Sequence, residues 1–296
     1  MRSRCREHRR APSAARMAVT MAIAISTSCG AAPPLCKVAV HDAHAAPPLW
    51  RVQGPSGSTV WLYGTIHDAG AEDVPAVAWT LLDAAPAFVS ELGDAEPDPH
   101  KLSELARLPW GQVLDRLLPA DDWWDLVNAM LGVMSEEDLR HARPWFAMIK
   151  LISHMAPSPR PSMDDALAAH ARTRGIAVEH LEPWEAQLVA LDASVTVADL
   201  SKAIHGRHAM ACDLVRLRSA YRTSDLPALT HALIGTAQSE ALLVERNRRW
   251  LPQIERYLAG RGAFIAVGLG HLLGDAGLPA MLERAGYPAK RHVAAP

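Results

Sequence analysis

The chain has 296 residues, of which 49% are hydrophobic and 21% are charged. This composition is typical of a globular protein, and the length allows one large domain or two small ones. The formal net charge of −2 excludes the strongly basic surface that most nucleic-acid-binding proteins have, so nucleic acid is not the expected partner.

Residues 1–45 differ from the rest and are predicted to be a leader. Six arginines precede the apolar stretch 17–25, and small residues follow it, which is the layout of a secretory signal. Cleavage is expected after Ala45, which would leave a periplasmic or extracellular protein. Lipid attachment at Cys29 is an alternative and the one expected route to membrane association, although Ser26 stands where such a motif normally has a bulky aliphatic residue. The apolar stretch is shorter than the roughly 20 residues that span a bilayer.

The cysteines are concentrated in this leader. Cys5, Cys29 and Cys36 lie there, which leaves Cys212 alone in the expected mature chain. No intramolecular disulfide is therefore expected, and Cys212 is interpreted as a buried residue of a helix rather than a nucleophile.

After the leader, the pattern predicts a strand, helix, strand unit. Segments 49–53 and 59–64 are predicted strands, and the turn-rich sequence GPSGS between them indicates a hairpin. A helix is expected from Pro75 through residue 84, followed by a strand at 87–92 that contains Glu91.

The middle of the chain is predicted to be helical. Residues 101–161 are expected to form an insertion that prolines divide into separate helices, with three tryptophans in core or helix-packing positions: Trp123, Trp124 and Trp145. Ser162 is expected to cap a helix that ends at Gly175. A strand at 176–181 and a helix at 183–192 follow.

Residues 197–258 are mostly helical in pattern, and the last predicted strand is 263–267, followed by a helix at 277–285 and an edge strand. Strands at both ends of the chain surround a helical middle. We therefore predict an α/β fold with a central mixed β-sheet built from N- and C-terminal segments, in a single domain over residues 46–296.

One motif occurs twice. The sequences GTIH at 64–67 and GLGH at 268–271 each end an apolar, strand-like run with Gly-x-x-His. The glycine would let the backbone turn sharply, and His67 and His271 would then lie at the carboxyl ends of strands, where α/β sheets bind their ligands. The two histidines would meet if their strands are neighbours.

A divalent metal site is expected at this edge. His67, His271 and Glu91 are residue types that bind such an ion, and three protein ligands leave one position open for water. A single histidine at a strand end is more often a structural hydrogen-bonding residue, and the repetition strengthens the functional interpretation. Glu91 ends a strand that is otherwise apolar, and a buried carboxylate needs a metal or an arginine as partner.

Further polar residues are candidates for the same site. Glu182 follows the strand at 176–181, although it is equally suited to a solvated loop or a helix cap. Arg246 and Asn247 lie in a long helix before the last strand, and Arg246 is suited to holding a carboxylate or an oxyanion. His205 and His208 share a predicted helix face and are interpreted as a surface pair rather than a metal site.

Six segments, taken in order, resemble the TraB/GumN family, which includes the animal Tiki proteases. They are WLYGTIH from Trp61, FVSEL from Phe88, RPW from Arg143, MDDALAAHARTRGIAVEHLEPWEAQL from Met163, ERNRRW from Glu245 and VGLGHLLGDAGL from Val267. The resemblance extends over about residues 50–293. Each segment alone is a weak signal, and the ordered set is specific.

The resemblance implies a sheet-centred α/β fold, similar to erythromycin-esterase-like and ChaN-like proteins, and a site built from the two Gly-x-x-His turns and a glutamate. His67, His271 and Glu91 occupy these positions. Four further positions match residues of the family's site: Asp164, Glu182, Arg246 and Asn247. Tiki members resemble Mn- or Co-dependent peptidases that act outside the cell, and this activity does not automatically transfer to other relatives.

The main hypothesis is an exported metal-dependent hydrolase that acts on a peptide or small-molecule substrate. A Mn, Co or Zn ion held by His67, Glu91 and His271 would lower the pKa of its bound water. Arg246 would stabilise the oxyanion, and the base would be Asp164, Glu182 or, if the ion has another ligand, Glu91. The alternatives are a protein that binds a small ligand, metal, haem or peptide without turnover, and a metal-free hydrolase with a histidine base.

Overall fold

The computed structural model describes residues 47–93, 97–234 and 240–293, and the predicted leader lies outside them. The described residues form a six-stranded sheet with the order β4-β3-β5-β2-β1-β6. The strands are β1 (Leu49–Gln53), β2 (Thr59–Thr65), β3 (Ala87–Leu92), β4 (Ala177–Glu182), β5 (Ala263–Gly268) and β6 (Ala289–Arg291).

The sheet is mixed, as the sequence predicts. Strands β2, β3, β4 and β5 are parallel, while β1 is antiparallel to both β2 and β6. The predicted hairpin is confirmed, because Gln53 pairs with Thr59 across the short loop. Strand β5 lies between β2 and β3, so N- and C-terminal segments are interleaved at the centre of the sheet.

Helices account for most of the remaining described chain. They are η1 (Ala71–Asp73), α1 (Ala76–Asp83), α2 (Pro99–Ala106), α3 (Leu114–Leu117), α4 (Ala120–Ala129), α5 (Glu136–Arg140), α6 (Pro144–Met155), α7 (Met163–Thr173), α8 (Trp184–Ser194), α9 (Val197–Thr223), α10 (Leu226–Ile234), the π-helix η2 (Glu240–Val244), α11 (Glu245–Ala259), η3 (Leu269–Leu272) and α12 (Leu278–Arg284). The predicted cap is confirmed, since the Ser162 hydroxyl accepts a hydrogen bond from the Asp165 amide.

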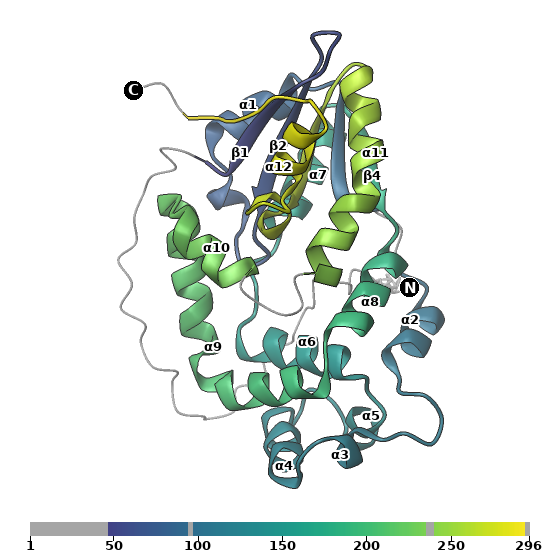
Figure 1. Cartoon of the computed structure of the whole chain (residues 1–296). Helices are drawn as coiled ribbons and strands as arrows, with labels where there is room; N and C mark the ends of the chain where they lie inside the picture. The colour runs from purple at the N-terminus through teal and green to yellow at the C-terminus, as the bar shows by residue number, and fades with distance from the viewer. Residues whose placement is uncertain (1–46, 94–96, 235–239, 294–296) are drawn as a thin grey trace, which may run out of the picture.

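Helices cover both faces of the sheet. Helix α7 packs against β3 and β4, whereas α11 packs against β2 and β4 and α12 against β1 and β6. Figure 1 shows α11 and α12 in front of the sheet and α1 and α7 behind it. Helices α2 and α8, which are the next helices in the chain after β3 and β4, lie below the sheet in this view. The carboxyl ends of the parallel strands therefore face the helical part of the molecule.

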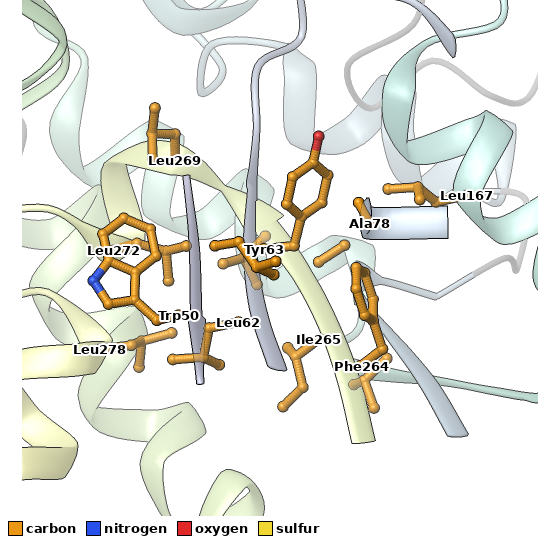
Figure 2. Close-up of a cluster of buried hydrophobic side chains, with 14 of the residues drawn as sticks. Trp50, Leu62, Tyr63, Ala78, Leu167, Phe264, Ile265, Leu269, Leu272 and Leu278 are labelled. Atoms are coloured by element: carbon orange, nitrogen blue, oxygen red, sulfur yellow. The ribbon is translucent and has the colours of Figure 1, made fainter. Parts of the chain in front are cut away.

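The main core is formed by the two faces of the central strands. Leu62 and Ile265 are register partners that point to one face, whereas Tyr63 points to the other. There the ring of Tyr63 lies 5.8 Å from that of Phe264. Figure 2 shows these side chains among their neighbours from the flanking helices. All four are fully buried, so the strand ends are fixed by packing on both sides.

The helical part has a core of its own. Helices α3 to α6 bury a second cluster that includes Leu126 and Leu151, and the first half of α9 completes it with Leu200 and Ile204. Trp123 and Trp145 are buried, as predicted. The prediction for Trp124 is wrong, because Trp124 is 55% exposed; the buried face of α4 consists of Asp122, Trp123 and Leu126, and Trp124 lies outside it.

Two further predictions bear on Cys212 and on membranes. Cys212 is disulfide-bonded, which corrects the expectation of an unpaired cysteine; the other three cysteines lie in residues 1–46, outside the described residues. No helix in the described part of the chain is long and apolar enough to cross a bilayer.

Candidate functional site

The parallel register of the sheet brings the two Gly-x-x-His turns together. Thr65 at the end of β2 is directly opposite Gly268 at the end of β5. His67 and His271 follow these two residues, and Glu91 lies near the end of β3, which is the other neighbour of β5. The predicted convergence of the histidines at one edge of the sheet is therefore confirmed.

Two of the motif glycines, Gly64 and Gly270, leave room for close packing. Gly64 lies inside β2, which corrects the expectation that it turns the chain, whereas Gly268 is the residue at which the chain passes from β5 into η3. Both keep negative φ angles. A Cβ atom on Gly64 would lie 2.6 Å from the Leu269 side chain of the other motif. A Cβ atom on Gly270 would lie 3.2 Å from the side chain of Leu243 in η2. Glycine thus lets the two motifs, and η2, approach each other closely.

Glu91 is held by three donors. Its Oε1 accepts hydrogen bonds from Arg246 and from Gln187 Nε2, the latter at 3.1 Å, and its Oε2 accepts one from the Gly268 amide at 3.0 Å. Burial raises the pKa of Glu91, but the positive charge of Arg246, with smaller contributions from His271, His67 and the Gly268 amide, outweighs burial and holds the pKa well below its usual value. Glu91 is therefore an ionised, fully engaged carboxylate and a weak base.

Glu182 is the second carboxylate that Arg246 holds. Its Oε1 accepts from Arg246 Nε at 2.8 Å and from Nη2 at 2.6 Å, and its Oε2 accepts from Trp250 Nε1 at 3.1 Å. Only 5% of the Glu182 side chain is exposed. The predicted role of Glu182 as a general base is not favoured by this geometry, because substrate would have to displace these donors.

Arg246 joins the two carboxylates to His271. Besides Glu91 and Glu182, its Nη1 donates to the Leu242 carbonyl at 3.1 Å and approaches His271 Nε2 at 3.2 Å. These contacts use all five N–H groups of the guanidinium. No donor is left for a developing oxyanion, so the geometry favours a positioning role for Arg246 over the predicted oxyanion role.

Asn247 fixes the ring of His271. Its amide nitrogen donates to the His271 carbonyl at 3.1 Å and to the Ala276 carbonyl at 3.0 Å, which leaves the amide oxygen to accept from His271 Nδ1 at 2.7 Å. His271 is therefore the Nδ1-protonated tautomer, and its Nε2 carries the lone pair. Burial lowers the pKa of His271 to about 3, so the ring stays neutral at physiological pH.

His67 and Asp164 form the accessible part of the site. His67 Nδ1 lies 3.7 Å from Asp164 Oδ2, and the two side chains are 52% and 34% exposed. Thr65 donates its hydroxyl to the other Asp164 oxygen at 2.8 Å. Partial enclosure by the protein raises the pKa of Asp164 despite the opposing effects of His67 and Thr65. Asp164 is thus more basic and more accessible than Glu91.

The donors for a metal ion are present but are not assembled as a ligand set. Among the described residues, no group of three or more His, Cys, Asp or Glu side chains is placed to hold a metal ion. The Nε2 lone pair of His271 and the carboxylate of Glu91 both face the guanidinium of Arg246 instead. Chemically these donors suit a divalent ion, and binding one would require Arg246 to move.

Three residues of the site were not predicted: Thr65, Gln187 and Trp250. Thr65 lies inside the first motif, GTIH, and its position there could have suggested it from the sequence. The structure shows that it is a buried polar residue at the end of β2. Gln187 and Trp250 are on helices α8 and α11, where their spacing resembles ordinary core positions. His205, by contrast, pairs with Asp122 of α4 at 2.7 Å in the helical part, in agreement with its interpretation as a residue outside the site.

Comparison with known proteins supports the resemblance noted in the sequence. The model of the TraB/PrgY/gumN family matches residues 48–291, which includes every residue of the site described above. No curated protein matches the chain.

Proposed function

Because the chain belongs to the TraB/PrgY/gumN family, we propose that it is a hydrolase and that its reaction takes place beside His67 and Asp164. In this proposal His67 removes a proton from the attacking water. Asp164 orients the imidazole and stabilises its protonated form, as the third member of a catalytic triad does.

The observation that supports this proposal best is the chain of contacts from Thr65 to Asp164 to His67. The Thr65 hydroxyl occupies Asp164 Oδ1 and leaves Oδ2 facing His67 Nδ1. The distance of 3.7 Å is longer than a hydrogen bond, and catalytic contacts are often this loose before substrate binds. The half-exposed imidazole is accessible to substrate, unlike the buried ring of His271.

The buried residues next to this pair would then form a rigid, preorganised part of the site. Arg246 bridges Glu91 and Glu182, and Asn247 fixes His271, so none of these groups needs to rearrange during the reaction. The pKa of Glu91 is lowered and that of Asp164 is raised, so Glu91 stays ionised while Asp164 is the more basic carboxylate. Active sites often contain two carboxylates whose pKa values differ in this way.

A metal-dependent hydrolase is the second candidate, and the tautomer of His271 favours it. A histidine that donates Nδ1–H to a neighbour and presents Nε2 is the usual form of a metal ligand. A Mn, Co or Zn ion would be held by His67, Glu91 and His271 and would supply a bound water of lowered pKa. Arg246 would then have to leave the Nε2 lone pair of His271 and the Glu91 carboxylate.

Peptides are the proposed substrates, and the support is the resemblance to Tiki proteases. A small-molecule ester or amide is the alternative class for the same chemistry. Export through residues 1–45, with or without lipid at Cys29, is likewise proposed from the sequence pattern, which would place the reaction in the periplasm or outside the cell.

The test compares wild type with His67→Ala and Asp164→Asn on a mixed-sequence peptide library and a panel of simple esters. Each assay is run as purified, after exhaustive chelation, and after addition of Mn or Co. We expect turnover that survives chelation and is lost in both variants. Turnover that disappears on chelation and returns with metal would favour the second candidate. Ligand binding without turnover in any condition would instead support a binding protein.

A further inference from the structure

A groove lies in the helical part of the molecule, on elements that contribute nothing to the strand-end site. It is lined by the loop between α2 and α3, residues 107–113, together with Glu104 of α2, Arg116 of α3, and His141 and Arg143 before α6. Its volume is about 780 Å³. This size lies within the range of ligand pockets, roughly 300–1,000 Å³, and is too large for a single small ion.

The loop presents a tryptophan entirely to solvent. Trp110 is 102% exposed, the highest value among the large hydrophobic side chains of the described chain. Gly111 follows with φ +83°, a left-handed conformation that favours glycine and lets the loop turn directly after the indole. Leu108, Pro109 and Val113 add apolar surface to the groove. A large aromatic ring left in water beside other apolar groups marks an interaction site.

Two arginines supply unneutralised positive charge. Arg107 and Arg116 both line the groove and are exposed, and neither is paired with a carboxylate among the described residues. The nearby Arg140 and Arg143 differ, because Arg140 pairs with Asp115 and Arg143 with Asp192. Glu104 is the one acidic residue among the described groove residues. The groove therefore combines net positive charge with an aromatic surface.

We propose that this groove is a binding site for a peptide segment that has acidic side chains next to an aromatic or aliphatic one. The guanidinium groups of Arg107 and Arg116 bind the carboxylates, for which their planar donor arrangement is suited. Trp110 covers the apolar side chain. The groove is a second binding site that does not depend on the proposed hydrolysis, since none of its residues takes part in the strand-end site.

The experiment is calorimetric titration of the full chain with three blocked peptides of equal length. The first has the sequence Glu-Glu-Phe-Glu-Glu, the second replaces each Glu with Gln, and the third replaces Phe with Ala. We expect the first to bind at least about tenfold more tightly than either of the others, with affinity that falls as salt is raised. Equal binding of all three, or no binding of the first, would overturn the proposal.

Matched variants locate the site. Trp110→Ala, and the double change Arg107→Glu with Arg116→Glu, should each weaken binding of the first peptide about tenfold or more. The controls are Trp124→Ala, an exposed tryptophan outside the groove, and Arg216→Glu, an exposed arginine on α9. All positions are exposed, and thermal unfolding checks that each variant is folded.

The controls should bind as wild type does. Equal loss in the controls would overturn the proposal. Loss of binding in His67→Ala with full binding in the groove variants would also overturn it, because the peptide would then occupy the strand-end site. Failure of the hydrolase proposal would leave these binding results unchanged, so the two failures are distinguishable.

Discussion

Replacing Arg246 with Met should strongly destabilise the protein, because it removes the cation that two buried carboxylates share. Glu91 and Glu182 are 11% and 5% exposed, and Arg246 is 4% exposed. Methionine keeps most of the side chain's apolar volume, so the main effect is the loss of charge compensation. Removing one partner from a buried ion pair costs about 3–5 kcal/mol. For a domain of about 250 residues this corresponds to a melting temperature lower by roughly 6–20 °C.

The loss should depend on pH in a defined direction. The pKa of Glu91 is held well below its unfolded value, so its ion pair contributes stability above about pH 4.5, and this stability is lost as the pH falls. In the variant, protonation relieves the uncompensated carboxylates. The difference in unfolding free energy between wild type and Arg246→Met should therefore be largest near pH 7.5 and smaller near pH 4.

Chemical denaturation at these two pH values measures the effect. The control is Arg248→Met, two residues along the same helix, whose side chain is exposed and pairs with Glu240 and Glu245 at the surface. We expect the control to unfold like wild type. The reasoning would be refuted if Arg246→Met were no less stable than the control, or if its loss were the same at both pH values.

Three further predictions concern residues around the site. Asp73→Asn should lower the free energy of unfolding by about 3 kcal/mol at pH 7, measured with denaturant, because it removes the carboxylate that two arginines of α9 contact. Burial raises the pKa of Asp73, but hydrogen bonds from those arginines outweigh burial and keep the pKa low. The difference between variant and wild type should therefore decrease below about pH 4. An equal loss at pH 3 would contradict this. Gln187→Leu should lower the free energy of unfolding by about 1–2 kcal/mol, because Glu91 loses a hydrogen-bond donor. It should also lower kcat about tenfold, and an unchanged kcat would show that Gln187 does not position Glu91. Thr65→Val should move the acidic limb of kcat/KM to higher pH, because Asp164 loses a hydrogen bond that lowers its pKa; an unmoved limb would count against Asp164 as the group that must be ionised.

The architecture follows from local patterns in the sequence. The apolar runs before the two motif histidines are buried strands, as their pattern predicts. That these two strands are neighbours is a finding of the structure, which the sequence left open. The prolines, glycines and capping serine mark the helix ends because their effects are confined to neighbouring backbone groups. Such signals need no knowledge of distant contacts.

The arrangement inside the site could not be predicted in the same way. The five contacts of Arg246 join residues of β3, β4, η2 and η3, and a sequence gives no distances among elements so far apart. The predicted residues lie together, but the sequence could not show that the guanidinium of Arg246 contacts the donors expected to hold a metal ion. The role of Gly64 could not be predicted for the same reason. A side chain at this position would collide with Leu269, which lies some 200 residues away in the sequence.

We propose above all that hydrolysis takes place at His67 and Asp164. The most direct test is kcat/KM on the best substrate from the library, measured for wild type, His67→Ala and Asp164→Asn after chelation, with Arg248→Met as the control. Both site variants are expected to lose activity by about a hundredfold or more, while the control and the chelated wild type retain it. Retention of activity in His67→Ala would show that the reaction does not take place at this pair.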